Sequence, residues 1–194
     1  MTTNLLLCGV GGQGTVLASK LLASAAMHKG LHVRTAETIG MAQRGGCVVS
    51  HVRMSDGEIF SSLIPKGTAD MIIAFEPSEA VRCESYLKPD GTVIVSTKAI
   101  QPVTMSLDPK AAARDTAGEM LAYLTARYKT VCVDTEKICA ELGSPKVMNM
   151  VLLNAAAATG CLGITAEELC RVVKARVSPK FVEMNLAALR LDLE

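Results

Sequence analysis

The sequence predicts an α/β fold: a Rossmann-like, mostly parallel sheet with flanking helices, followed by a helical C-terminal extension. An apolar run at Leu5–Cys8 leads into a glycine-rich turn that ends at Gly14, and a helical pattern begins at Val16. Basic residues and Gly30 are typical of a helix end, and a second short strand is expected at Leu31–Ala36. This β-α-β unit predicts parallel strands joined by a right-handed crossover.

Later segments continue this alternation. We expect strands at Cys47–Arg53, Ala69–Phe75, Thr92–Ser96 and Thr130–Asp134, a hairpin strand at Glu58–Leu63, and helices at Pro77–Leu87 and Lys110–Arg127. Turns are expected at Ser55–Gly57 and Pro89–Gly91. Helix starts are expected at Ser144-Pro145, Thr165–Glu168 and Ser178-Pro179. We therefore expect a single domain over residues 1–194, with a sheet part to about residue 135 and a helical part from about residue 136.

The composition favours a chain that is partly buried against partners. Apolar residues make up 49% of the chain, but it has no Trp and only three Phe and three Tyr, so aliphatic packing must dominate. The net charge of +1, without long blocks of like charge, argues against a nucleic-acid partner. The apolar stretch Val147–Ile164 contains Asn149 and Asn154, and we expect a buried helix and turn there rather than a membrane span. A cytoplasmic location without membrane association is expected.

Metal ligands are not indicated in this chain. Its seven cysteines never occur as C-x-x-C, and most are expected to be buried in a reducing compartment. Cys8 and Cys47 flank glycine-rich segments, where we interpret both as packing residues. The three histidines, at 28, 32 and 51, lack metal-ligand spacing. We predict no metal site and no catalytic residue in this chain.

The first glycine segment allows several interpretations. Gly9, Gly11 and Gly14 follow a strand in the pattern G-x-G-x-x-G, which is typical of a dinucleotide-binding loop. The expected acid is displaced, because Glu37 lies beyond the expected strand end, although Arg34 is suited to a 2′-phosphate. A stand-alone NAD(P)-dependent dehydrogenase and a non-catalytic nucleotide-binding module are therefore alternatives. Glycines that serve only close packing are a third.

A second glycine segment makes the pattern more specific. The segments Cys8–Thr15 (CGVGGQGT) and Gly40–Arg53 (GMAQRGGCVVSHVR) together resemble the gamma-type domain of 2-oxoacid:ferredoxin oxidoreductases. The resemblance covers about residues 4 to 190. Further matches resemble the version found as the small beta subunit of indolepyruvate:ferredoxin oxidoreductases: Ile64-Pro65, Ala69-Asp70, Phe75-Glu76-Pro77 and Glu79-Ala80. Asn154 departs from the pattern, since glycine is expected between Leu153 and Ala155.

The resemblance implies a subunit that is inactive on its own. Such complexes decarboxylate a 2-oxoacid, such as an aryl pyruvate, on thiamine diphosphate. They pass electrons through [4Fe–4S] clusters to ferredoxin and transfer the acyl group to coenzyme A (CoA), giving acyl-CoA and CO2. Thiamine diphosphate, Mg²⁺ and the clusters are expected on a large alpha partner subunit, with no cofactor bound by this chain. The isolated chain is expected to be able to form a homodimer through its partner-facing surface.

The two glycine segments supply the predicted site. Amides at a helix start attract anions, and a guanidinium such as that of Arg44 pairs with carboxylate or phosphate by two hydrogen bonds. An interface salt bridge is the alternative role for Arg44. Contacts to CoA, to the 2-oxoacid or only to the partner chain remain open. The candidates are Gly11, Gly12, Gln13, Gly14, Thr15, Gln43, Arg44, Gly45 and Gly46.

Overall fold

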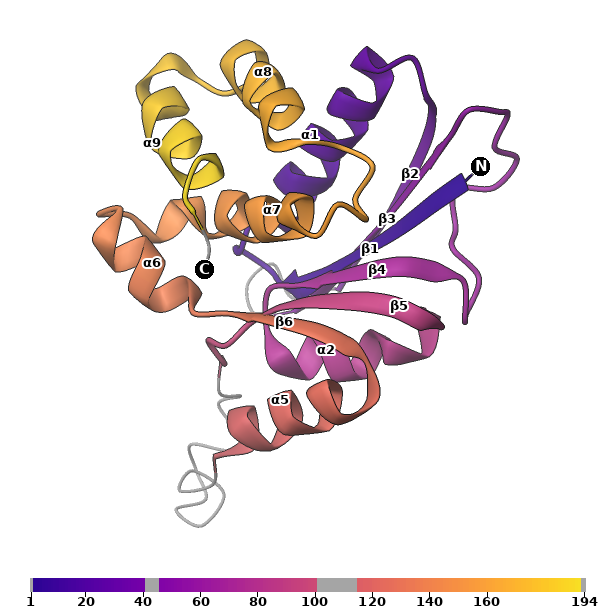
Figure 1. The fold of residues 1–194 in the computed structure, drawn as a ribbon, viewed down its shortest axis with the longest axis vertical. Helices are drawn as coiled ribbons and strands as arrows, with labels where there is room; N and C mark the ends of the chain where they lie inside the picture. Colours follow the sequence, from indigo (N-terminus) through magenta and orange to yellow (C-terminus); the bar gives the residue numbers. More distant parts are fainter. Residues whose placement is uncertain (1, 41–45, 101–114, 193–194) are drawn as a thin grey trace.

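The computed structural model describes residues 2–40, 46–100 and 115–192, which form a six-stranded sheet with helices on both faces (Figure 1). The strand order is β2-β3-β1-β4-β5-β6. β1, β4, β5 and β6 pair in parallel, which confirms the mostly parallel α/β fold. The strands are β1 (Thr2–Val10), β2 (His32–Ile39), β3 (Cys47–Ser55), β4 (Ala69–Ala74), β5 (Leu87–Ser96) and β6 (Lys129–Val133).

The opening β-α-β unit has one strand inserted in it. β3 pairs antiparallel with both β1 and β2, so β1 and β2 run in the same direction, as expected, but are not neighbours. β3 is paired with β1 from Cys47 to Ser55 and with β2 from Val48 to Ser55. The sequence prediction of a parallel direction is therefore correct, and β3 lies between the two parallel strands.

The helices form two layers. Figure 1 shows α1, α7, α8 and α9 on one side of the sheet and α2 and α5 on the other. There are also two short 3-10 helices: η1 (Glu84–Tyr86) directly follows α2, and η2 (Pro145–Val147) directly precedes α7. The α-helices are α1 (Thr15–His28), α2 (Pro77–Cys83), α5 (Thr116–Arg127), α6 (Thr135–Glu141), α7 (Met148–Ala158), α8 (Ala166–Arg176) and α9 (Pro179–Leu189).

Alternating side chains of β1 divide the core into two clusters. Leu5 and Leu7 pack with α1 and α7, whereas Leu6 and Cys8 pack with α2, as expected for a strand whose successive side chains face opposite ways. The α7 side chains from Met148 to Ala156 are buried. The buried helix and turn predicted for Val147–Ile164 are therefore confirmed. Among the described residues, no helix is long and apolar enough to cross a membrane.

Two local predictions are wrong. Residues 58–63 do not form a hairpin strand, because β3 already has a partner strand along each edge and offers no free ladder. The turn expected at Pro89–Gly91 lies inside β5, which begins at Leu87 and shifts its register against β4 at this point. The helix expected at Lys110–Arg127 begins at Thr116 in the part that the structure describes.

Helix starts in the C-terminal part follow the predicted signals. Thr165 and Glu168 form a capping box at the start of α8, with both reciprocal hydrogen bonds present. The Ser144 side chain accepts a hydrogen bond from the Lys146 amide at the start of η2, and α7 follows. Pro179 opens α9 without a side-chain cap from Ser178. Each of these helix starts depends on residues within a few positions of one another, so it can be predicted from the sequence.

Candidate functional site

The two glycine segments meet at the carboxyl end of β1. The Gly11 N–H donates to the carbonyl oxygen of Gly46 over 2.8 Å, and Val10 lies opposite Cys47 in the β1–β3 ladder. The Gly40 N–H in turn donates to the Cys47 carbonyl over 2.9 Å. Residues far apart in the sequence therefore form one surface at this end of the sheet.

Glycine is required in the first loop for two different reasons. Gly12 and Gly14 have φ values of 99° and 88°, in the left-handed region that side chains disfavour. Gly9 is required by close approach instead, because a Cβ there would lie 2.7 Å from Gln13 Oε1 and 2.8 Å from Phe75 Cβ. The loop is thus tightly folded against the end of β4.

Gln13 holds the loop from within. Its Oε1 accepts from the Val10 N–H over 2.8 Å, and its Nε2 donates to the Phe75 carbonyl over 3.1 Å. Both ends of the amide therefore contact the protein's own backbone.

The start of α1 offers an anion site. Gly14 occupies the N-cap position without a side-chain cap, and the first turn has no acidic residue. Thr15 is 2% exposed, and its Oγ1 has no hydrogen-bond partner among the described residues. Free amides at a helix start, together with an unpaired buried hydroxyl, suit a carboxylate or phosphate oxygen. Beside them is a cavity of about 290 Å³, lined by Val10, Gly12, Gly14, Thr15, Val16 and Val48.

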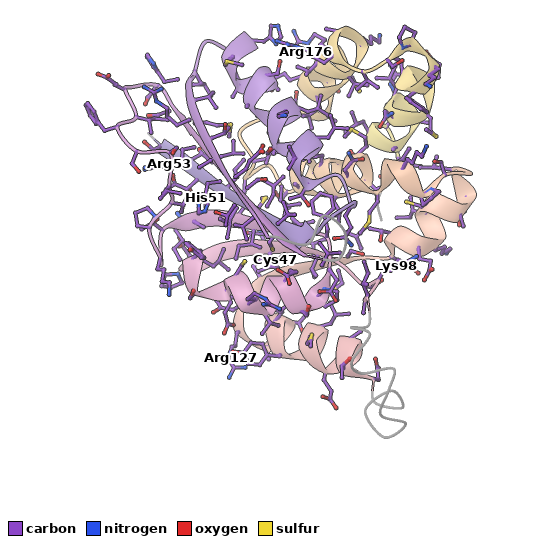
Figure 2. The ribbon with its side chains drawn as sticks, turned by 180° about the vertical axis from the view of Figure 1, so that it is seen from behind. Cys47, His51, Arg53, Lys98, Arg127 and Arg176 are labelled. Carbon is purple, nitrogen blue, oxygen red and sulfur yellow. The ribbon has the colours of Figure 1, made fainter. Side chains whose placement is uncertain are left out.

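A larger cavity of about 750 Å³ extends from the glycine loop to α6, η2 and α7. Lys98, labelled in Figure 2, follows β5 and lines this cavity. It pairs with Glu136 over 2.8 Å. The second lysine of its lining, Lys146, belongs to η2, and Asn149 is buried beside Gly14. Leu17 and Ile100 add apolar lining and are 45% and 44% exposed. The cavity therefore combines cationic, amide and apolar groups with one carboxylate, that of Glu136.

Sequence reasoning missed this larger cavity. The two lysines and Asn149 come from separate segments, and no common motif links them. Only the position of Lys98 just after a parallel strand gave a usable signal, since ligands bind at the carboxyl ends of such strands.

Cys47 begins β3 and contacts a buried carboxylate. Its Sγ donates to Glu79 Oε2 over 2.7 Å, and Glu79 is 3% exposed. Burial, followed by the Glu79 contact, raises the pKa of the Cys47 thiol to about 12. A hydrogen bond with Cys83, followed by burial, raises the pKa of Cys8 well above its ordinary value. Neither thiol is activated, which agrees with packing roles.

The cysteines are dispersed through the described part of the chain. Cys8, Cys83 and Cys139 are buried, Cys47 and Cys170 are partly exposed, and Cys132 and Cys161 are exposed, so the prediction that most are buried is wrong. Within residues 2–40, 46–100 and 115–192, no three His, Cys, Asp or Glu side chains are grouped to hold a metal ion.

His51 is a core histidine. It is 4% exposed, its Nδ1 accepts from the Ile64 N–H over 3.2 Å, and its ring lies edge-on to Tyr86. Burial lowers its pKa. Figure 2 shows that Cys47, His51 and Arg53 follow β3 progressively away from the glycine loop. The histidine therefore belongs to the packing below the site.

The geometry disfavours the dinucleotide interpretation. Glu37 lies within β2, not beyond its end as predicted, and its Oε1 is 3.3 Å from Ser19 Oγ. Because β3 separates β2 from β1, this acid is on the second strand away from the glycine loop. The Arg34 Nε donates to the Ile59 carbonyl, toward the other end of the strands. A dinucleotide-binding site requires an acid near the ribose, and Glu37 is not placed there. NADP binding would also require Arg34 near the 2′-phosphate, and Arg34 is not placed there either.

The predicted site residues are partly brought together. Gly11, Gly12, Gln13, Gly14 and Thr15 form one loop, with Gly46 beside it. Gln43, Arg44 and Gly45 lie outside the described residues. The fold and loop define a Rossmann-like domain whose glycine turn, beside an antiparallel third strand, borders a cavity.

Comparison with known proteins assigns this domain to a family. The family described as pyruvate ferredoxin/flavodoxin oxidoreductase matches residues 4–193. The chain belongs to this family, as the two glycine segments predicted.

Curated relatives agree over nearly the whole chain. The indolepyruvate oxidoreductase subunit IorB of Thermococcus kodakarensis is 35% identical over 98% of this chain and 94% of the relative. The protein of the same name from Archaeoglobus fulgidus is 37% identical over 98% and 94%. The chain is therefore an oxidoreductase subunit rather than a complete enzyme.

Solved structures support the fold. The gamma subunit of a keto/oxoacid ferredoxin oxidoreductase from Geobacter sulfurreducens aligns with a TM-score of 0.71 at 24% identity, over 98% of this chain and 93% of that chain. The 2-oxoglutarate:ferredoxin oxidoreductase of Magnetococcus marinus aligns with a TM-score of 0.71 at 20% identity, over 97% of this chain but 30% of that chain. The same fold thus occurs within a much longer polypeptide.

Proposed function

We propose that the chain is the small subunit of a 2-oxoacid:ferredoxin oxidoreductase that acts on indolepyruvate or a related aryl pyruvate. The 2-oxoacid anion and CoA give acyl-CoA, CO2, one proton and two electrons, and the electrons reduce ferredoxin. The substrate assignment is supported by curated relatives named indolepyruvate oxidoreductase subunit, which are 35% to 37% identical over nearly the whole chain. Subunits named for pyruvate and ketoisovalerate are less similar, at 30% to 31%.

The cofactors belong to a large alpha partner subunit in this proposal. Thiamine diphosphate with Mg²⁺ supplies the carbanion chemistry there, and [4Fe–4S] clusters carry the electrons to ferredoxin. The described thiols of this chain do not fit a cluster, since no set of three ligands converges. The alignment with 30% of a longer oxidoreductase chain supports a role beside further domains. Such a complex would work in the cytoplasm.

This chain would contribute an anion-binding wall to the partner's site. The observation that carries this role is the contact of Gly11 with Gly46 beside an uncapped α1 start. The helix amides and the unpaired Thr15 hydroxyl would bind a carboxylate or phosphate oxygen of the 2-oxoacid or CoA. Lys146 supplies positive charge to the larger cavity, and Lys98 lines it in an ion pair with Glu136. Arg44, outside the described residues, is proposed as a further anion contact.

Co-expression with the large subunit tests the function. Each subunit alone should be inactive, and the complex should reduce ferredoxin only with an aryl 2-oxoacid and CoA together. An active complex that prefers pyruvate would contradict the substrate assignment. Calorimetry of the isolated chain with NADH and NADPH tests the alternatives, and we expect no binding.

Thr15→Val tests the anion site, because the two expected effects have opposite signs. The variant removes a buried hydroxyl that has no partner, so the isolated chain should gain roughly 1 kcal/mol of stability. In the complex, the loss of a bond to an anion should raise KM for CoA or for the 2-oxoacid about tenfold. Arg44→Ala should raise the same KM. Unchanged KM values in both variants would refute the proposed contacts.

A further inference from the structure

One short segment contacts both glycine segments. Residues Phe75–Ala80 (FEPSEA) comprise the two-residue link after β4, Phe75-Glu76, and the first turn of α2. The Phe75 carbonyl accepts from Gln13 Nε2 over 3.1 Å, and Glu79 Oε2 accepts from Cys47 Sγ over 2.7 Å. The first contact reaches the loop after β1, and the second reaches the start of β3.

The segment is itself firmly fixed. The Phe75 side chain is fully buried, and its N–H donates to the Cys8 carbonyl over 2.8 Å. Glu76 caps α2: its Oε2 accepts from the Glu79 N–H over 3.1 Å and from the Ser78 hydroxyl. Glu76 and Glu79 are each 3% exposed. A buried segment whose polar groups are hydrogen-bonded is rigid, so it can fix the positions of the residues that contact it.

Gln13 lines the larger cavity, but its side-chain amide is used in hydrogen bonds that brace the loop. Its oxygen accepts one backbone bond and its nitrogen donates another, so an amide is required at this length. A carboxylate would keep the first bond and lose the second. A Cβ at Gly9 would clash with both Gln13 and Phe75, so Gly9, Gln13 and Phe75 are closely packed.

Glu79 makes the matching contact on the other segment. Its Oε2 accepts a hydrogen bond from the Cys47 thiol, and its Oε1 lies 3.3 Å from Arg82 Nε. Cys47 directly follows Gly46, whose carbonyl accepts the Gly11 amide. Cys47 therefore connects Glu79 to the point where the two glycine segments meet.

We propose that the Phe75–Ala80 segment positions both glycine segments, with Gln13 and Glu79 as positioning residues that touch no ligand. The effect on catalysis rests on the proposed function, but the positioning itself does not. It accounts for a sequence feature, the FEPSEA segment, to which the proposed reaction assigns no role.

Hydrogen exchange in the full-length isolated chain tests the Gln13 brace. Gln13→Met removes both side-chain bonds, so the Val10 amide should exchange about fivefold faster, the factor expected for one ordinary hydrogen bond. Gln13→Glu keeps the Val10 bond, and exchange there should stay within about twofold of wild type while the amides of residues 11–15 exchange faster. Exposed Glu58→Gln, at the other end of the sheet, is the control. Unchanged exchange at residues 10–15 in Gln13→Met would overturn the proposal.

Thiol labelling tests the Glu79 contact. Loss of the carboxylate in Glu79→Gln should increase the thiolate fraction of Cys47 and its alkylation by iodoacetamide near pH 8, about tenfold for each pKa unit regained. The exposed Cys132 is the internal reference and should label at the wild-type rate. An unchanged Cys47 rate would exclude a controlling role for Glu79.

Kinetics of the assembled complex separate positioning from direct binding. Gln13→Met should raise KM for CoA or the 2-oxoacid, and Gln13→Glu should restore part of the affinity in proportion to its restored exchange protection. A raised KM with unchanged exchange would show that Gln13 contacts the ligand, against the proposal. If the wild-type complex lacks the proposed activity, the proposed function fails, while the exchange and labelling results still decide the positioning role.

Discussion

The amide of Gly11 donates to the carbonyl of Gly46 over 2.8 Å, which joins the turn after β1 to the residue before β3. This contact exists because β3 is inserted antiparallel between β1 and β2. In a dinucleotide-binding fold, both neighbours of the first strand would be parallel to it, with their carboxyl ends near the glycine turn, whereas β1 here has one parallel neighbour, β4. Here the amino end of β3 lies there instead, with Gly46 in contact with the turn.

The two positive-φ glycines of this turn should differ in their tolerance of alanine. Gly12→Ala meets only backbone strain, since no atom lies within 4 Å of the added Cβ. Gly14→Ala meets similar strain and also places its Cβ 3.0 Å from Asn149 Nδ2. We expect a loss of roughly 1 to 2 kcal/mol for Gly12→Ala and a larger loss for Gly14→Ala, measured by urea unfolding. Equal losses would show that Asn149 moves aside freely.

Protonation of His51 should weaken the fold below neutral pH. Burial lowers its pKa from the ordinary 6.5, and its Nδ1 accepts the Ile64 amide, so the folded chain holds the neutral ring. The unfolded chain binds more protons as pH falls through 6.5, and stability should therefore fall there and be fully present above it. The loss is at most about 1.4 kcal/mol for each pH unit below that value.

His51→Asn is the matched control for this titration, because its Oδ1 lies where the imidazole Nδ1 lies and can still accept the Ile64 amide but does not titrate. Unfolding in urea at about pH 7.5 and about pH 5.5 should show a larger loss for wild type than for His51→Asn. Identical losses would mean that His51 titrates normally in the folded chain.

Local signals predicted most of the architecture. The apolar strands, the glycine at the end of α1 and the Thr165 capping box each depend on residues within a few positions, and the structure contains all of them. The prediction of a hairpin strand after β3 was wrong. The local residue pattern favours a hairpin, but β2, which comes earlier in the chain, already pairs with the edge of β3 that the hairpin strand would need. Strand order depends on pairing between residues far apart in the sequence, and the spacing of apolar residues and turns does not predict it.

The candidate site was predicted in part for the same reason. Gly12 and Gly14 were recognisable because positive φ requires glycine at those positions. Gln13 was grouped with them by sequence, yet its side chain turns inward, since the Val10 amide and the Phe75 carbonyl lie within reach only in the folded chain. Lys98 and Lys146 reach one cavity through the packing of α6 and η2, which no motif describes.

Arg53 should be needed to hold the loop that presents Phe60. Its Nε donates to Asn4 Oδ1 over 2.9 Å, and its Nη1 donates to the carbonyls of Ser61 and Leu63 over 2.9 and 3.3 Å. Phe60 is 92% exposed. A lysine ammonium cannot reproduce this fork, so Arg53→Lys should increase chymotrypsin cleavage after Phe60 severalfold.

Arg176→Lys is the control for that experiment, because Arg176 is exposed at the end of α8 (Figure 2). It should leave the cleavage rate at the wild-type value. If Arg53→Lys also cleaves at that rate, the backbone contacts of Arg53 do not order the loop.

Asn154, which stands where the family pattern predicts glycine, should anchor the C-terminal segment to α7. Its Nδ2 donates to the Leu191 carbonyl over 2.7 Å, and the side chain is 6% exposed. Asn154→Ala loses this bond but gains helix propensity, so its net loss should be below about 1 kcal/mol. Asn154→Gly loses the bond and also about 1 kcal/mol of helix propensity relative to alanine. Amides of residues 190–192 should exchange faster in both variants to the same extent, whereas α7 amides should exchange faster only with glycine. Unchanged exchange at 190–192 in both would show that the Leu191 contact does not hold the segment.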